Sequence, residues 1–172
     1  PEYDLFFAMS HGVHRGVLKK GKFDQRENFI NNLIKKNPTL KFNIFGMNNI
    51  HPIWGDEFKN NLFNSKIALN LSQGIPLKYY SSDRIAQLMG NGIATLVDKK
   101  TQLNKFFSNE EVMFYNSASD LSKKLNFMLK NHKLRNKLAK KGRSIYHKKF
   151  NSKIVADFII CKIFNINKKF NW

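Results

Sequence analysis

The sequence predicts an α/β protein built on one doubly wound parallel sheet of about five strands, followed by a helical C-terminal tail. Apolar runs of strand length alternate with segments whose apolar residues recur at helical spacing, which is the pattern of a parallel sheet with crossover helices. The 172 residues, 42% of them hydrophobic, suffice for one ordinary core. No internal repeat or low-complexity linker divides the chain. We therefore expect one sheet domain over residues 1–150 and a basic, apolar helix over 151–172.

Five short runs rich in aliphatic, aromatic or β-branched residues have the length and composition of strands. The predicted strands are residues 3–10, 40–46, 66–73, 93–98 and 111–117. Polar loops are expected between them, including residues 11–25 after the first strand and 48–57 after the second.

The intervening segments carry apolar residues on one helical face. The predicted helices are residues 26–36, 58–66, 83–92, 118–132, 133–150 and 152–164. Pro38 ends the first because proline cannot continue a helix, and Gly90 and Gly92 suit the end of the third. In the second we expect Phe58, Leu62 and Phe63 to face inward. The C-terminal helix is expected to pack on the sheet domain or on a missing N-terminal domain.

Cysteine usage and hydropathy favour a cytoplasmic protein. Cys161 is the only cysteine and cannot form an internal disulfide. The longest dense apolar stretch, Val155 to Phe164, contains two charged residues and is shorter than the roughly 20 residues needed to span a bilayer. We interpret it as a buried or docking helix. The chain begins at Pro1 without a signal peptide, so we expect it to be part of a longer polypeptide.

The formal net charge of +18 is concentrated near the C-terminus. Residues 1–122 hold 15 Lys/Arg and 11 Asp/Glu, whereas residues 123–172 hold 15 Lys/Arg and 1 Asp/Glu. Such a face attracts phosphate groups of nucleic acids, anionic lipids or phosphorylated substrates. Solvated surface lysines, in a chain rich in Lys, Asn, Ile and Phe, are the alternative explanation.

The candidate ligand site lies after the third predicted strand, because parallel sheets of this kind bind ligands at the carboxyl ends of their strands. Tyr80, Ser81, Ser82, Asp83 and Arg84 come directly before or at the start of the helix 83–92. A helix amino terminus presents unpaired N–H groups and partial positive charge, so it is suited to bind an anion. Ser82 or Asp83 is the expected capping residue.

The same helix has two distinct faces. Arg84, Gln87 and Asn91 fall on one side, and three apolar residues form the adjacent side that can pack on the sheet. A cation in the first turn opposes the helix dipole. A bound diphosphate would remove that conflict for Arg84; a solvated side chain or an ion pair with Asp83 is the alternative.

Several short motifs, in order along the chain, resemble the C-terminal donor-binding domain of two-domain glycosyltransferases of the GT-B type. The resemblance is to the group 1 glycosyl transferases, with their spore-maturation-like branch, and covers about residues 3–158. The matching residues are Ala68, Leu69, Asn70, Ser82, Arg84, Gln87, Gly92, Leu96, Asp98, Glu110, Glu111, Val112, Phe114, Tyr115, Asp120, Leu121, Arg135, Lys137, Leu138, Ala139, Gly142 and Arg143.

The resemblance implies a Rossmann-like domain that forms half of the enzyme and binds a UDP- or GDP-type sugar donor without a metal or other cofactor. The diphosphate would lie between the helix at Asp83 and the first loop, whose glycines allow nearby cations to approach phosphate. The implied catalytic residues are Arg15 and Arg84, with Lys20 as second choice to Arg15. The implied donor-binding residues are Gly12, Lys20, Tyr80, Ser81, Ser82, Asp83 and Gln87.

The resemblance also implies partners. The acceptor would be an envelope, polysaccharide or lipid-linked molecule, and the general base would come from the missing N-terminal domain. This chain alone would bind donor weakly and transfer nothing. An anionic membrane surface, at the inner face of the membrane, would suit the basic tail.

The sequence departs from the family pattern at two positions. Retaining members carry two glutamates eight positions apart, and Tyr79 and Gln87 stand there instead. Gln87 can still bond a ribose hydroxyl, but without charge assistance, so the usual retaining pattern is not supported. Fucosyltransferase-like donor sites offer a second alignment, in which Asp83 takes the ribose and Arg84 the phosphates.

Other chemistry has little support. His11 and His14 have no cysteine or acidic partner at a suitable spacing, so no metal site is expected. Trp54 and its neighbours after the second strand are candidates to hold the base. Two other functions remain as alternatives: a non-catalytic Rossmann-like module, and a basic nucleic-acid-binding domain, which is disfavoured because the tail aromatics fall on apolar helix faces.

Overall fold

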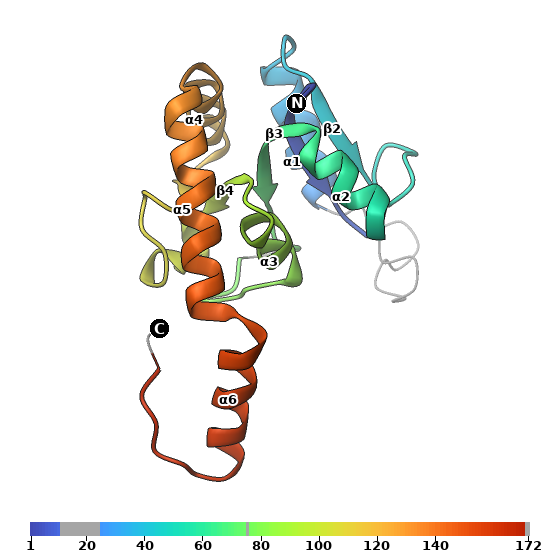
Figure 1. Ribbon diagram of the computed structural model, residues 1–172. Coiled ribbons are helices and arrows are strands. Elements are labelled where there is room, and N and C mark those ends of the chain that lie inside the picture. Colours follow the sequence, from blue (N-terminus) through green and yellow to red (C-terminus); the bar gives the residue numbers. More distant parts are fainter. Residues whose placement is uncertain (11–24, 75, 171–172) are drawn as a thin grey trace.

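A five-stranded parallel sheet in the order β2-β1-β3-β4-β5 forms the centre of the computed structural model, which describes residues 1–10, 25–74 and 76–170. The strands are β1 (Tyr3–Ala8), β2 (Phe42–Phe45), β3 (Ser65–Asn70), β4 (Ala94–Asp98) and β5 (Met113–Tyr115). The α-helices are α1 (Gln25–Lys36), α2 (Gly55–Phe63), α3 (Asp83–Gly90), α4 (Ala118–Lys130), α5 (His132–Phe150) and α6 (Ser152–Ile163). Two 3₁₀ turns, η1 (Lys99–Thr101) and η2 (Leu103–Lys105), follow β4. The predicted α/β class is confirmed (Figure 1).

Helices cover both faces of the sheet. Leu5 and Phe7 of β1 pack in the core with α1 and α4, whereas Phe6 packs with α2 and α3 on the other face. This alternation follows from the two-residue period of a strand. The sheet is therefore buried on both sides, which explains why its strands are almost continuously apolar.

Helix α5 crosses the sheet at the amino-terminal ends of β4 and β5. A Cβ added to Gly142 would lie 2.6 Å from the carbonyl oxygen of Glu111, just before β5. Arg143 packs against Gly92, just before β4, where φ is +76°. The middle of α5 therefore lies at the amino-terminal ends of these strands, whereas its last turn reaches the segment that follows β4, where Phe150 packs against Phe106 and Phe107.

Helix α6 projects from the body of the domain, and the segment after it returns alongside (Figure 1). The amide of Ile166 donates to the Cys161 carbonyl, Lys168 pairs with Asp157, and Phe170 packs edge-on to Phe158. The exposed apolar side chains of this hairpin are Val155, Ile159, Ile160, Ile163, Phe164 and Ile166. Within the described ranges, no helix is long and apolar enough to cross a membrane.

Two sequence expectations about α2 are wrong. The helix begins at Gly55 rather than at residue 58, because the acidic pair Asp56 and Glu57 forms its first turn, where negative charge is favourable. Phe63 is 45% exposed rather than inward, since it is the last residue of a helix that buries Leu62. Predicted strand ends also extend too far: β3 ends at Asn70 instead of residue 73.

Candidate functional site

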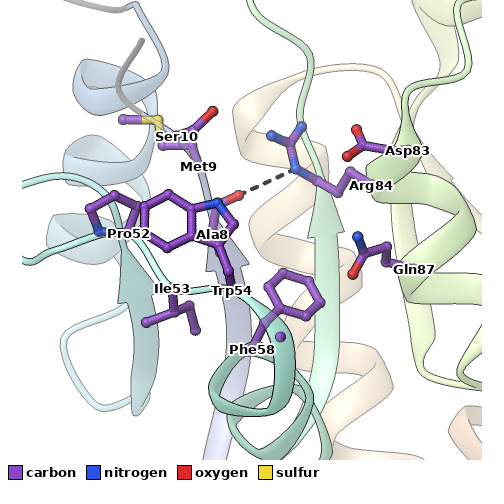
Figure 2. A pocket seen from close by; sticks show the side chains of 11 residues that line it. Ala8, Met9, Ser10, Pro52, Ile53, Trp54, Phe58, Asp83, Arg84 and Gln87 are labelled. Carbon is purple, nitrogen blue, oxygen red and sulfur yellow. Dashed lines mark hydrogen bonds between the residues drawn. The ribbon is translucent and has the colours of Figure 1, made fainter. Parts of the chain in front are cut away.

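A pocket of about 160 Å³ opens at the carboxyl edge of the sheet (Figure 2). Its walls come from the end of β1, from the segment that joins β2 to α2, and from the first two turns of α3. These three walls are far apart in sequence. They meet because the parallel strands that precede them end at the same edge.

The pocket adjoins the point at which the direction of winding changes. The chain passes from β1 outward to β2 on one side, and then returns to β3 on the other side of β1. Open α/β sheets bind ligands in the crevice beside such a point, at the carboxyl ends of the strands. The predicted place of the site is thus the place where the structure has a pocket.

Arg84 extends from α3 over this crevice. Its Nη1 donates to the carbonyl oxygen of Leu71 at 2.6 Å, and its Nε donates to that of Ala8 at 3.3 Å. The guanidinium carbon lies 5.4 Å from the centre of the Phe7 ring. Arg84 is thus bound to the strand ends rather than only solvated, and Figure 2 shows it above the pocket.

The amino end of α3 faces the same space. Ser82 is at the N-cap position with extended backbone, but its side chain makes no capping hydrogen bond. Asp83 is the exposed first residue of the helix and lines the pocket with Arg84 and Gln87. The expected side-chain cap by Ser82 is therefore not observed.

The opposite wall is apolar and aromatic. Phe58 packs edge-on to Phe6, with ring centres 5.1 Å apart, and this contact fixes its place at the base of the wall. Ile53 is buried beside it, whereas Trp54 is 62% exposed at the mouth. The sequence pointed to Trp54, but not to Ile53 or Phe58, whose apolar character is equally typical of core positions.

Three predicted donor-binding residues do not line the pocket: Ser82, which is half-buried, and Tyr80 and Ser81, which are exposed. Their loop is held toward β4, since the Tyr79 amide donates to the Thr101 carbonyl at 2.7 Å and the Tyr79 ring packs edge-on to Phe106. Tyr79 adopts a positive φ of 61°, an uncommon conformation for a bulky residue.

Several predicted residues cannot be placed. Gly12, Arg15 and Lys20, together with His11 and His14, lie outside the described residues. Among the residues that the structure does describe, no group of three or more His, Cys, Asp or Glu side chains could hold a metal ion.

The fold and the pocket define this chain as a Rossmann-like α/β domain of the type that binds ligands at the carboxyl edge of a parallel sheet. It belongs to the glycosyl transferase-like family, whose sequence model matches residues 25–160. The predicted resemblance is confirmed at this level, while the spore-maturation-like branch stays a prediction. A comparison with curated proteins finds no match.

Solved structures support the fold assignment. The chain is similar to the C-terminal domain of a glycosyl transferase group 1 family protein (LpcC) from Francisella tularensis, at a TM-score of 0.51 and 14% identity over 81% of this chain and 66% of that one. It is also similar to Anabaena Alr3699/HepE in complex with UDP, at a TM-score of 0.59 and 11% identity over 83% of this chain and 38% of that one. A third similar structure is sucrose-phosphate synthase (tll1590) from Thermosynechococcus elongatus, at a TM-score of 0.57 and 13% identity over 83% of this chain and 35% of that one. The chain thus spans just over a third of the last two proteins, and about two thirds of the isolated domain.

Proposed function

We propose that this chain is the donor-binding part of a glycosyltransferase that takes a sugar from a UDP- or GDP-type donor. The observation that carries the proposal is the position of the pocket: it adjoins the switch point and the amino end of α3, in a chain of the glycosyl transferase-like family. One similar structure is described in complex with UDP. The acceptor that we propose is an envelope, polysaccharide or lipid-linked molecule.

The two walls of the pocket suit the two parts of a nucleotide. The apolar wall at Ile53, Trp54 and Phe58 offers contact area to a base. The amino end of α3 offers positive potential to a diphosphate, and that potential stabilises the charge that develops on the leaving group. Gln87 is exposed on the pocket lining, and its side-chain amide can offer a hydrogen bond to a ribose hydroxyl.

The size of the pocket favours a second domain. Its volume of about 160 Å³ is below the ~300 Å³ at which typical small-molecule sites begin. A nucleotide sugar would therefore be only partly enclosed. We propose that a further domain of a longer polypeptide closes over the donor and supplies the general base, as Tyr79 and Gln87 bring no carboxylate to the positions where retaining relatives have one.

Two further partner proposals concern the C-terminal part. The exposed apolar side chains of α6 favour packing against that second domain, since a monomer in water rarely leaves such a contiguous patch uncovered. The basic tail favours contact with anionic membrane on the cytoplasmic side. Flotation with neutral and anionic vesicles tests the membrane proposal. Equal amounts of protein floating with both vesicle types would contradict it.

Calorimetric titration tests the donor site. We expect UDP or GDP to bind, weakly in this chain alone, and to be preferred over short DNA and RNA. Gln87→Ala should weaken binding a few-fold because it removes a ribose hydrogen bond, whereas Gln25→Ala, an exposed glutamine at the start of α1, is the matched control and should have no effect. Base-indifferent, salt-sensitive binding to polynucleotide without nucleotide binding would favour the nucleic-acid alternative.

A further inference from the structure

The hydrogen-bond ladder between β1 and β3 stops before the strands reach the pocket. The paired residues run from Tyr3 and Ser65 to Phe6 and Ala68. Beyond them, the Arg84 guanidinium connects the ends of the two strands. It donates to the carbonyl of Ala8, the last residue of β1, and to the carbonyl of Leu71, directly after β3. A side chain thus continues the connection that the backbone ladder no longer makes.

We propose that Arg84 is a positioning residue, which fixes the separation of the β1 and β3 ends and thereby the shape of the donor pocket. The inference rests on the proposed function only in naming a nucleotide donor as the ligand of the pocket. That Arg84 holds the two strand ends does not depend on that function. It changes the role expected from the sequence: Nε and Nη1 of Arg84 bind the protein backbone, so the residue acts on the donor through the strand ends that it holds.

Arginine is suited to this position for geometric reasons. Its planar guanidinium presents donors in fixed directions, so one group can bind the carbonyls of two different strand ends. The face of the same group can lie over an aromatic ring, here that of Phe7. A lysine ammonium keeps the charge but has no planar fork and no face to stack. The carbonyl contacts also explain how a cation is tolerated in the first turn of α3, since its charge is directed to carbonyl oxygens at the strand ends.

The residues that Arg84 holds lead directly into the pocket wall. Ala8 is followed by Met9 and Ser10, and all three line the pocket. The Met9 amide donates to the Phe45 carbonyl at 3.1 Å, which links this segment to β2 on the other side. Loss of the guanidinium therefore frees the segment on the β3 side only, and widens the crevice between β1 and β3.

The substitution Arg84→Lys tests the inference, with Arg135→Lys as the matched control. Arg135 also donates through Nη1 to two carbonyls, of Met128 and Leu129 at 3.0 and 3.2 Å, and lies outside the pocket lining. NMR-detected titrations with uridine, UMP and UDP measure the dissociation constants. If Arg84 positions the wall, Arg84→Lys weakens all three ligands by a similar factor, about tenfold, and Arg135→Lys weakens none. A loss for UDP with unchanged uridine binding would instead show a direct diphosphate contact and overturn the inference.

Amide hydrogen exchange of the ligand-free protein gives an independent readout. We expect faster exchange at Met9, Leu71 and Ser72 in Arg84→Lys, and unchanged exchange there in Arg135→Lys. Unchanged exchange in Arg84→Lys contradicts the inference. If the wild-type chain binds no nucleotide, the proposed function fails, yet this measurement still decides the role of Arg84. If Arg84→Lys does not fold, Arg84→Gln, whose amide donates to one carbonyl, serves for the same comparison.

Discussion

The Tyr115 side chain is buried at the end of β5, and its hydroxyl has no hydrogen-bond partner among the described residues. Burial of an unpaired hydroxyl costs free energy, on the order of 1–3 kcal/mol. Burial also raises the pKa of this hydroxyl above its usual value, and the negative charge of Asp98 raises it further. Tyr115 is therefore a position where the polar atom opposes stability.

We predict that Tyr115→Phe increases the free energy of unfolding at pH 7 by up to about 1 kcal/mol, because it removes the unpaired hydroxyl and keeps the ring. Because folding raises the pKa of this tyrosine, the unfolded state ionises first as the pH rises above about 10, and the wild-type protein loses stability there. The advantage of Tyr115→Phe should therefore grow in alkaline buffer. Urea denaturation at pH 7 and pH 10.5 measures both effects, and a variant less stable than wild type at both pH values would contradict the prediction.

Sequence reasoning at the residue scale found part of the site. Asp83, Arg84 and Gln87 could be predicted because a polar cluster before an amphipathic helix is visible in the sequence. The partners of Arg84 could not, since they are backbone carbonyls of Ala8 and Leu71, and every residue carries a carbonyl. Only the folded chain brings those two together.

At the scale of elements, α5 shows that part of the C-terminal positive charge has partners within the fold. Arg135 donates to the last carbonyls of α4, and a His147 ring nitrogen lies 2.9 Å from the Gly90 carbonyl oxygen at the end of α3. Lys149 donates to the Phe106 carbonyl. Donors at helix carboxyl ends satisfy free carbonyls, and a cationic donor such as Arg135 also complements the dipole. These contacts account for part of the basic composition without a nucleic-acid partner.

The crossing of α5 over the sheet requires Gly142. Because an added Cβ would lie 2.6 Å from the Glu111 carbonyl oxygen, Gly142→Ala should lower the free energy of unfolding by about 1–3 kcal/mol. Gly90→Ala is the matched control: its Cβ would meet the Tyr146 ring at 3.8 Å, an ordinary contact. In a helix, Gly→Ala on its own stabilises by about 0.5–1 kcal/mol. Thermal unfolding should therefore shift the two variants in opposite directions; an equal shift would mean that α5 does not pack this closely.

The start of β1 is tied to its neighbours by Asp4. Its carboxylate accepts from the Lys41 amide at 2.9 Å and from the Lys66 ammonium at 2.7 Å. Burial alone would raise the pKa of Asp4, but the hydrogen bonds from Lys66 and Lys41 outweigh it, so the pKa is lowered.

A lowered pKa means that Asp4 contributes stability above its unfolded pKa, and that this contribution is lost as the pH falls through the lower folded value. After allowance for solvent screening, we expect Asp4→Asn to cost roughly 0.5–1 kcal/mol at pH 7. The cost should shrink as the pH falls below the unfolded pKa of about 4 and through the lower folded value, because the carboxyl group of Asp4 then becomes neutral, like the amide. Urea titrations of the two proteins across this range measure the difference, and a constant difference at every pH would exclude the ionised carboxylate as its source.

The sequence predicted the existence and order of every strand and α-helix that the structure describes. It succeeded because the periodic apolar patterns are long and the helix ends carry Pro38 and Gly92. It failed at boundaries. Residues 71–73 continue the apolar and polar pattern of β3, yet the chain leaves the sheet there because the pairing with β1 has already ended.

At the scale of the whole molecule, the α6 hairpin leaves apolar surface uncovered. We predict that Phe164→Asp, at a side chain that is 70% exposed, changes the free energy of unfolding of this chain by less than about 0.5 kcal/mol. In a longer polypeptide that contains the proposed second domain, the same substitution should lower stability by several times as much, because it places a charge in an interface.

Phe127→Asp on α4 is the control, since this side chain is 51% exposed but does not belong to the hairpin. It should have the same small effect in both proteins. Parallel thermal unfolding of the short and long proteins gives the comparison. If Phe164→Asp is equally mild in both, α6 does not pack on the second domain.

The central claim is that a nucleoside diphosphate binds at the carboxyl edge of the sheet, between the end of β1, the segment leading into α2 and the start of α3. Chemical-shift mapping of the isotope-labelled chain during a UDP titration tests it most directly. The account predicts that the largest changes occur at residues 8–10, 52–58 and 83–87. Changes centred on α5 and α6, or no change at saturating UDP and GDP, would contradict it.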